Sequence, residues 1–102
     1  MKLLVLIIHN NLKQDVADLF RSIEEVKGFT FSDAEGHGVQ SDKDPFLSNR
    51  DKVVGYTPRV RVDILLEDKD VELVLTSLRK SNMGLNEHTV FWVTVVGECG
   101  RL

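Results

Sequence analysis

Three histidines are the residues of this chain best suited to bind a metal ion: His9, His37 and His88. Imidazole, thiolate and carboxylate groups together suit zinc or copper, and the sequence supplies further groups of these kinds at Asp42, Asp44, Glu87 and Cys99. No two of these residues have the short spacing of a metal-binding motif. His37 and His88 need not meet within one subunit, and a cleft between subunits could bring such groups together.

Two other features could indicate catalysis, and neither predicts an enzyme. Cys99 is the single cysteine, and no base or orienting group accompanies it, as a nucleophile requires. The run Gly38–Gln40 is similar to part of the acylphosphatase phosphate loop, but Asp42 and Asp44 follow it. Because two carboxylates would repel a phosphate, we expect no catalysis here.

The elements that position these residues follow from the spacing of apolar side chains. The patterns predict strands at residues 3–8, 29–35, 59–67 and 89–96, and helices at residues 12–23 and 71–78. Asn11, with Gln14 three residues later, is predicted to cap the first helix, and Asp68 or Asp70 the second. The order βαββαβ predicts an α+β, ferredoxin-like fold: a four-stranded antiparallel sheet of order 4-1-3-2 with both helices on one face.

Length and composition indicate one globular domain spanning residues 1–102. The chain has 42% hydrophobic residues and a net charge of −3, which argues against a nucleic-acid-binding protein. The longest apolar run, Leu3–Ile8, is too short for a bilayer span or a secretory signal. We therefore expect a cytoplasmic protein with no direct membrane insertion.

The last strand is apolar on both faces. Phe91 and Val93 lie on one face, and Val90 and Trp92 on the other. A sheet with helices on only one side would expose a large apolar patch there, and such patches mark interaction surfaces. The pattern predicts a homo-oligomer that covers the open sheet face and buries Trp92.

About twenty residues, 36–57, connect the second and third strands. Antiparallel neighbours need only a short turn, and a connection this long in a small domain is commonly functional. We expect this connection to be functional, and Phe46 and Leu47 are the apolar residues near its tip.

The sequence resembles the PII signal-transduction family over nearly its whole length. Gly36-His37-Gly38-Val39-Gln40 is similar to the entry of that family's long T-loop, and Pro58–Ile64 to the strand after it. The resemblance implies a homotrimer that binds ATP or ADP, with 2-oxoglutarate and magnesium, in clefts between subunits. It also implies a T-loop that docks on transporters, enzymes or regulators.

The sequence departs from the family pattern at cationic positions. Val39 stands where the family has arginine, residues 86–90 replace a lysine-containing segment, and one candidate, Arg101, remains of a C-terminal arginine pair. Phe46 lies near the place of a tyrosine that some members modify. Because cations hold phosphates, we expect tight ATP binding to be lost, although an adenine nucleotide or a divalent metal remains a possible ligand.

The residues expected at the ligand cleft are Gly36, Gly38 and Gln40, with Glu87, His88 and Arg101 approaching from a neighbour. The sequence thus predicts a PII-like trimeric regulator of nitrogen-regulation type, acting on a protein partner that could be a transporter. One alternative is a metal-responsive trimer similar to the CutA type, which serves metal homeostasis and would use His37 and His88. Another is an amino-acid-binding ACT-type domain, whose usually short connection between strands two and three disfavours it.

Overall fold

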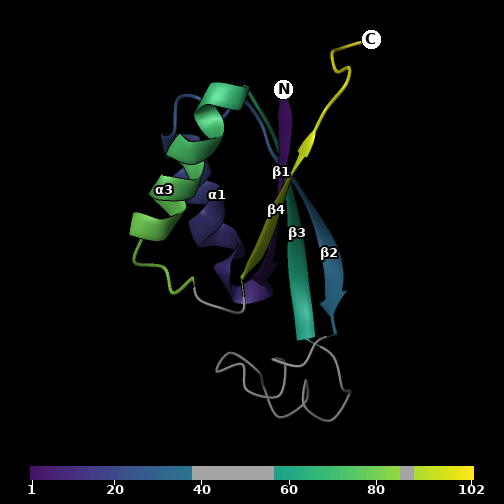
Figure 1. Ribbon diagram of the computed structural model, residues 1–102. Helices are drawn as coiled ribbons and strands as arrows, with labels where there is room; N and C mark the ends of the chain where they lie inside the picture. The colour runs from purple at the N-terminus through teal and green to yellow at the C-terminus, as the bar shows by residue number, and fades with distance from the viewer. Residues whose placement is uncertain (38–56, 86–88) are drawn as a thin grey trace.

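The computed structural model describes residues 1–37, 57–85 and 89–102 (Figure 1). Its elements are, in chain order, β1 (Lys2–His9), the 3₁₀ turn η1 (Asn10–Leu12), α1 (Lys13–Ser22), β2 (Thr30–Gly36), β3 (Thr57–Leu66), the 3₁₀ turn η3 (Asp68–Asp70), α3 (Val71–Lys80) and β4 (Val90–Val95). The order βαββαβ is confirmed. The connection between the second and third strands also lies where it was predicted, since β2 ends at Gly36 and β3 begins at Thr57.

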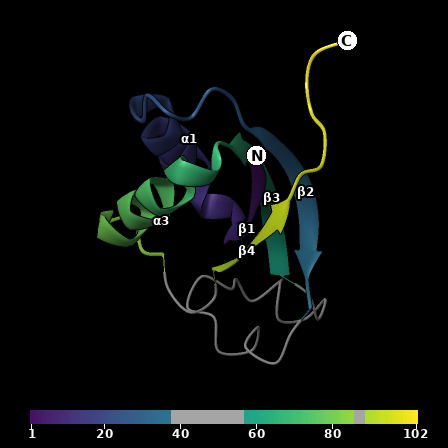
Figure 2. The same cartoon turned by 45° about the horizontal axis from the view of Figure 1, so that its top comes forward.

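The sheet has four strands in the order β2-β3-β1-β4, and each neighbouring pair is antiparallel. Helices α1 and α3 lie side by side against one face of the sheet, and the other face carries no element of the described chain (Figures 1 and 2). This confirms the predicted α+β, ferredoxin-like fold and its strand order.

The hydrophobic core lies between this sheet face and the two helices. Alternate residues of the central strands β1 and β3 point into it, because side chains of a strand alternate between its faces. The apolar stripes of α1 and α3 cover them, as the helical spacing predicted. The most deeply buried core residues include Leu4, Ile8, Val16, Phe20, Val62, Ile64 and Val74.

The start of α1 differs from the prediction. The N-cap position of α1 is Leu12, which makes no side-chain capping hydrogen bond in the described chain. The capping side chain belongs to His9, at the start of the preceding turn η1, where its Nδ1 accepts a hydrogen bond from the Asn11 backbone N–H at 3.2 Å. Asn11 lies inside the 3₁₀ turn η1, so its own side chain cannot act as an N-cap there. Gln14 is no capping-box partner either, because its side chain donates to Asp18 at 2.9 Å.

The predicted caps of α3 also differ. Asp70 holds the N-cap position, but its side chain makes no capping hydrogen bond within the described chain. Asp68 lies in η3 and pairs with the Met1 amine at 3.0 Å.

A charged pair of β3, Arg61 with Asp63, lies on the open face of the sheet. The Arg61 Nε–H is shared between the two Asp63 carboxylate oxygens at 3.2 and 3.1 Å, and Nη2 donates to Oδ1 at 3.0 Å. The Arg61 guanidinium carbon lies 5.8 Å from the centre of the Trp92 ring. Asp63 and Trp92 are the two cross-strand partners of Val5, which is fully buried. The hydrogen bond to Asp63 raises the pKa of Arg61. Trp92 itself remains 40% exposed.

Candidate functional site at the base of the connection

Three polar residues of the described chain are buried, and all three lie at one end of the sheet. His9 is 4% exposed, Thr57 is fully buried and Arg59 is 8% exposed. Strand pairing brings them together, because His9 is opposite Arg59, and Thr57 is opposite Gly36. Gly36 is the last residue of β2. The polar cluster therefore lies at the base of the connection between β2 and β3.

Arg59 crosses the backbone of β2 at Gly36. A Cβ atom built on Gly36 would lie 3.0 Å from Arg59 Cγ and 3.1 Å from Arg59 Nε. These distances are shorter than ordinary van der Waals contacts between carbon atoms. Glycine at this position thus lets the arginine stem lie flat against the strand end.

The hydrogen bond that His9 accepts determines where its ring proton lies. Because Nδ1 accepts the Asn11 N–H, a neutral imidazole must carry its proton on Nε2. In this state Nε2 is a donor and cannot ligate a metal. His9 therefore contributes an N–H group, not a metal ligand, to the cluster.

The chemistry of the cluster favours an anion. The Arg59 guanidinium is permanently charged and suits the planar geometry of carboxylate or phosphate oxygens. His9 adds a donor, and the buried Thr57 hydroxyl has no hydrogen-bond partner among the described residues. Charge-assisted hydrogen bonds of this kind are stronger than neutral ones.

Sequence reasoning missed this cluster. Arg59 lies on the same face of β3 as Arg61 and Asp63, but it is only 8% exposed. Its stem lies against the end of β2, where Gly36 has no side chain. His9, one of the three histidines suited to bind a metal ion, is buried as well.

Of the ligand residues predicted from the sequence, Gly36 lies at this site. Arg101 lies at the opposite end of the sheet, where it lines a cavity with Thr30 and Leu65. Within one chain, Arg101 and Gly36 therefore do not meet. The other predicted residues fall outside the described residues: Gly38, Gln40, Phe46, Leu47, Glu87 and His88.

The predicted metal ligand His37 is exposed, and its Nε2 lies 3.3 Å from Glu35 Oε2. Residues 1–37, 57–85 and 89–102 contain no group of three or more side chains that could hold a metal ion. His88, the other residue of that prediction, lies outside these ranges.

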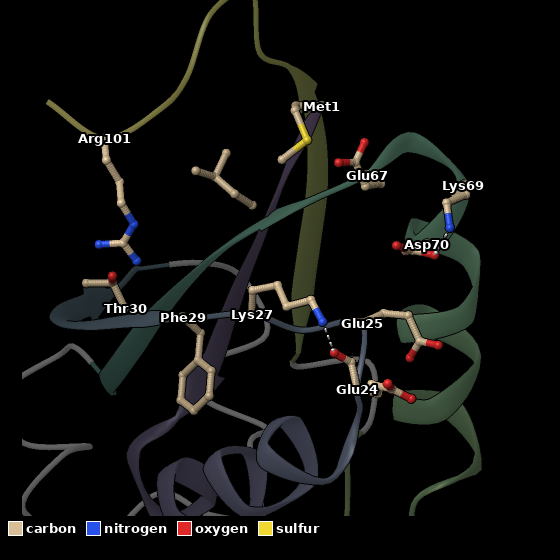
Figure 3. A pocket seen from close by; sticks show the side chains of 12 residues that line it. Met1, Glu24, Glu25, Lys27, Phe29, Thr30, Glu67, Lys69, Asp70 and Arg101 are labelled. Atoms are coloured by element: carbon tan, nitrogen blue, oxygen red, sulfur yellow. Dashed lines mark hydrogen bonds and ion pairs between the residues drawn. The ribbon is translucent and has the colours of Figure 1, made fainter.

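The cavity beside Arg101 has a volume of about 820 Å³ and is open to solvent. Figure 3 shows the Arg101 side chain on one side and the carboxylates of Glu67 and Asp70 on the other. Lys27 reaches the backbone carbonyl of Glu24 at 3.0 Å. This cavity lies far from the buried polar cluster, because the length of the sheet separates them.

No helix in the described part of the chain is long and apolar enough to cross a membrane.

The described chain is a ferredoxin-like α+β domain, and its buried polar residues gather where the second strand ends and the third strand begins. The chain belongs to the DUF3240 family, described as a protein of unknown function, and the family profile matches residues 1–102. A crystal structure of a DUF3240 family protein from Shewanella baltica OS155 has the same fold. Its TM-score is 0.76 at 22% identity, with 99% of this chain and 94% of that chain covered.

Curated relatives carry the name nitrogen regulatory protein P-II. The protein from Rhizobium leguminosarum bv. viciae is 30% identical over 56 residues, which are 55% of this chain and 50% of that protein. The protein from Azospirillum brasilense is 27% identical over 78 residues, 76% of this chain and 70% of that protein. The chain thus spans about half the length of the first relative. These matches confirm the resemblance to the PII family as that of a divergent branch.

Proposed function

We propose that this protein is a PII-like regulator, not an enzyme, that works as a homotrimer. A small anionic effector binds at the base of the connection between β2 and β3, in a cleft completed by a neighbouring subunit. The connection, residues 36–57, then acts on a protein partner, which could be a transporter. The relationship to proteins named nitrogen regulatory protein P-II supports the regulatory class.

One observation carries the effector site: the buried Arg59 lies directly against Gly36, where the connection begins. A ligand that binds the guanidinium would also fix the backbone at Gly36. Such a ligand favours one arrangement of the connection over others, which is how an effector shifts a population of conformations. Phe46 and Leu47 are the proposed anchors for the partner.

The charge of the cluster limits the effector. Arg59 is its single permanent cation among the described residues, which suits one carboxylate or phosphate group better than a triphosphate. The cations of the family pattern that are missing at Val39 and within residues 86–90 also favour a small anion over a triphosphate. We therefore propose a small mono- or dianion as the effector, with tight ATP binding absent.

Thermal unfolding with a ligand panel tests this proposal. The panel contains ATP, ADP and AMP, each with and without magnesium and 2-oxoglutarate, followed by 2-oxoglutarate alone, inorganic phosphate, zinc and copper. A ligand at a hundred times its dissociation constant adds about 2.7 kcal/mol per site. For a domain of this size that corresponds to a rise of about 10 °C or more in Tm.

Two arginine variants separate site binding from general charge effects. Arg59→Gln should abolish the rise in Tm, whereas Arg21→Gln, an equal change of charge on the exposed surface of α1, should retain it. If both variants keep the full rise, the effector does not bind at Arg59. A rise with zinc or copper alone would instead support the metal-responsive, CutA-like alternative.

A further inference from the structure

A second cavity of the described chain lies on the helix side of the sheet, between α3 and β4, and most of the residues that line it are apolar. We infer that this cavity binds a small amphipathic monocarboxylate: a molecule with one ring or short branched chain and one carboxylate group. The inference goes beyond the proposed function, because this cavity and the buried polar cluster lie on opposite faces of the sheet.

The floor of the cavity comes from two neighbouring strands. Leu6 of β1 and Phe91 of β4 are cross-strand partners, and both line the cavity. Leu6 belongs to the core between the sheet and the helices, so its partner Phe91 lies on that same face. His9 follows Leu6 by three residues. Because side chains alternate between the faces of a strand, His9 and its polar cluster lie on the other face.

The walls come from α3 and the segment that follows it. Leu75 and Leu78 lie one turn apart on the buried side of α3, each 5% exposed, and Leu85 packs against the core beyond the end of the helix. The cavity has a volume of about 340 Å³, which falls within the range of small-molecule pockets. An apolar cavity of about 150 Å³ can already hold benzene. There is therefore room for one ring and a short chain.

Arg79 places a positive charge at the mouth of the cavity. Its side chain lines the cavity and is 60% exposed, and its guanidinium carbon lies 5.9 Å from the centre of the Phe91 ring. Its one ion-pair partner among the described residues is Glu72, at 4.0 Å, which is too long for a hydrogen bond. The guanidinium can therefore donate to a ligand carboxylate, with the two parallel hydrogen bonds that this pair favours.

The C-terminal end of α3 limits the ligand to a single negative charge. Ser81 is the C-cap of α3 and also lines the cavity, so the negative end of the helix, equivalent to about half an elementary charge, lies beside it. Arg79 supplies one full positive charge. It can balance one carboxylate, whereas a phosphate dianion would keep an excess of negative charge next to the helix end. An ammonium group would be repelled by Arg79.

Neither half of such a ligand would bind well alone. A pair between exposed charged groups contributes little, and Arg79 is largely exposed. Transfer of an apolar group from water into the cavity is favourable, but only a polar contact at the mouth would fix its orientation. We therefore expect the ring and the carboxylate to be required together.

Methyl NMR of the full chain, with phenylpropionate as the probe, tests this inference. The methyl signals of Leu75, Leu78 and Leu85 should shift saturably, whereas those of Leu65, which lines the cavity beside Arg101, should stay in place. Phenylpropanol has the same ring and chain without the charge. It should bind at least about tenfold more weakly, the factor that a hydrogen bond to a charged group commonly contributes. Acetate, which has the charge without the ring, should leave these methyl signals unchanged.

Variants of Arg79 test the source of the preference for the carboxylate. Arg79→Gln should bind phenylpropionate and phenylpropanol with similar affinity, and Arg79→Lys, which keeps the charge, should retain part of the preference. Arg21→Gln, an equal change of charge on the exposed surface of α1, should retain all of it.

The inference is overturned if millimolar phenylpropionate causes no saturable shift, if phenylpropanol or acetate binds equally well, or if the preference survives Arg79→Gln. Shifts that Arg59→Gln abolishes would place the carboxylate in the proposed effector site and would also overturn it. The effector proposal depends on Arg59 and this one on Arg79, so either can fail while the other stands.

Discussion

Adding one methyl group at Gly36 should disturb the buried polar cluster directly. The new Cβ of Gly36→Ala would lie 3.0 Å from Arg59 Cγ, 3.1 Å from Arg59 Nε and 3.5 Å from the Thr57 carbonyl oxygen. Arg59 is 8% exposed, so its stem has little free space to move into. Overpacking of a buried site costs about 1–3 kcal/mol. We expect the lower end, about 1 kcal/mol, because a shift of a few tenths of an ångström relieves the contact.

The measurement is thermal unfolding of Gly36→Ala beside a matched glycine variant. A destabilisation of about 1 kcal/mol lowers the Tm of a domain this size by about 4–8 °C. Gly28→Ala is the control, since a Cβ at Gly28 meets nothing within 4 Å and Gly28 has no positive φ. That variant should be neutral or slightly stabilised, because alanine restricts the unfolded chain.

A double-mutant cycle then identifies the cause. If the methyl group acts by displacing the arginine, Gly36→Ala should cost little in an Arg59→Ala background, with a coupling of about 1 kcal/mol. Equal destabilisation in both backgrounds would refute the reasoning, as would a Gly36→Ala protein as stable as the unchanged chain. In the effector assay, Gly36→Ala should also reduce the ligand-induced rise in Tm, because it moves the guanidinium.

Three further outcomes are expected. Phe20→Ala should lower the free energy of unfolding, measured in urea, by about 3–5 kcal/mol. Phe20 is fully buried and packs edge-on against Phe29, with the two ring centres 5.4 Å apart. A loss below about 1 kcal/mol would contradict this packing. The hydrogen bond from the Met1 amine lowers the pKa of Asp68, so this pair should stabilise the fold above the unfolded carboxylate pKa of about 3.9. That contribution is lost as the pH falls through the lowered pKa that Asp68 has in the folded protein. The difference in stability between the unchanged protein and Asp68→Asn should therefore shrink in acid. A difference that does not depend on pH would contradict the pairing of Asp68 with the Met1 amine. Trp92 is the sole tryptophan, so dilution to dissociate the trimer should shift its emission to longer wavelength, and emission that does not change as the trimer dissociates would place Trp92 outside the interface.

Local patterns were sufficient to predict the architecture. The six-residue apolar run of β1, the stripe Val16–Phe20 in α1 and the alternation Val60-Val62-Ile64 in β3 each repeat with the period of one kind of element. Their order then leaves few topologies, because crossover handedness and adjacency are restricted. The ends of elements were less predictable. Asn11 is a good capping residue, but the chain continued into a 3₁₀ turn, and a histidine two residues earlier took the role.

Residue patterns were enough to predict the fold class, the position of the long connection and the apolar character of both faces of β4. Which polar residues are buried together depends on how the strands pair in space. His9 and Arg59 are fifty residues apart, and their contact follows from the antiparallel register of β1 and β3. Burial of Arg59 depends further on the absence of a side chain at Gly36, on a third strand. Periodicity reports which face a side chain occupies, whereas burial depends on what the neighbouring strands place over it, and that information exists only once the strands have paired.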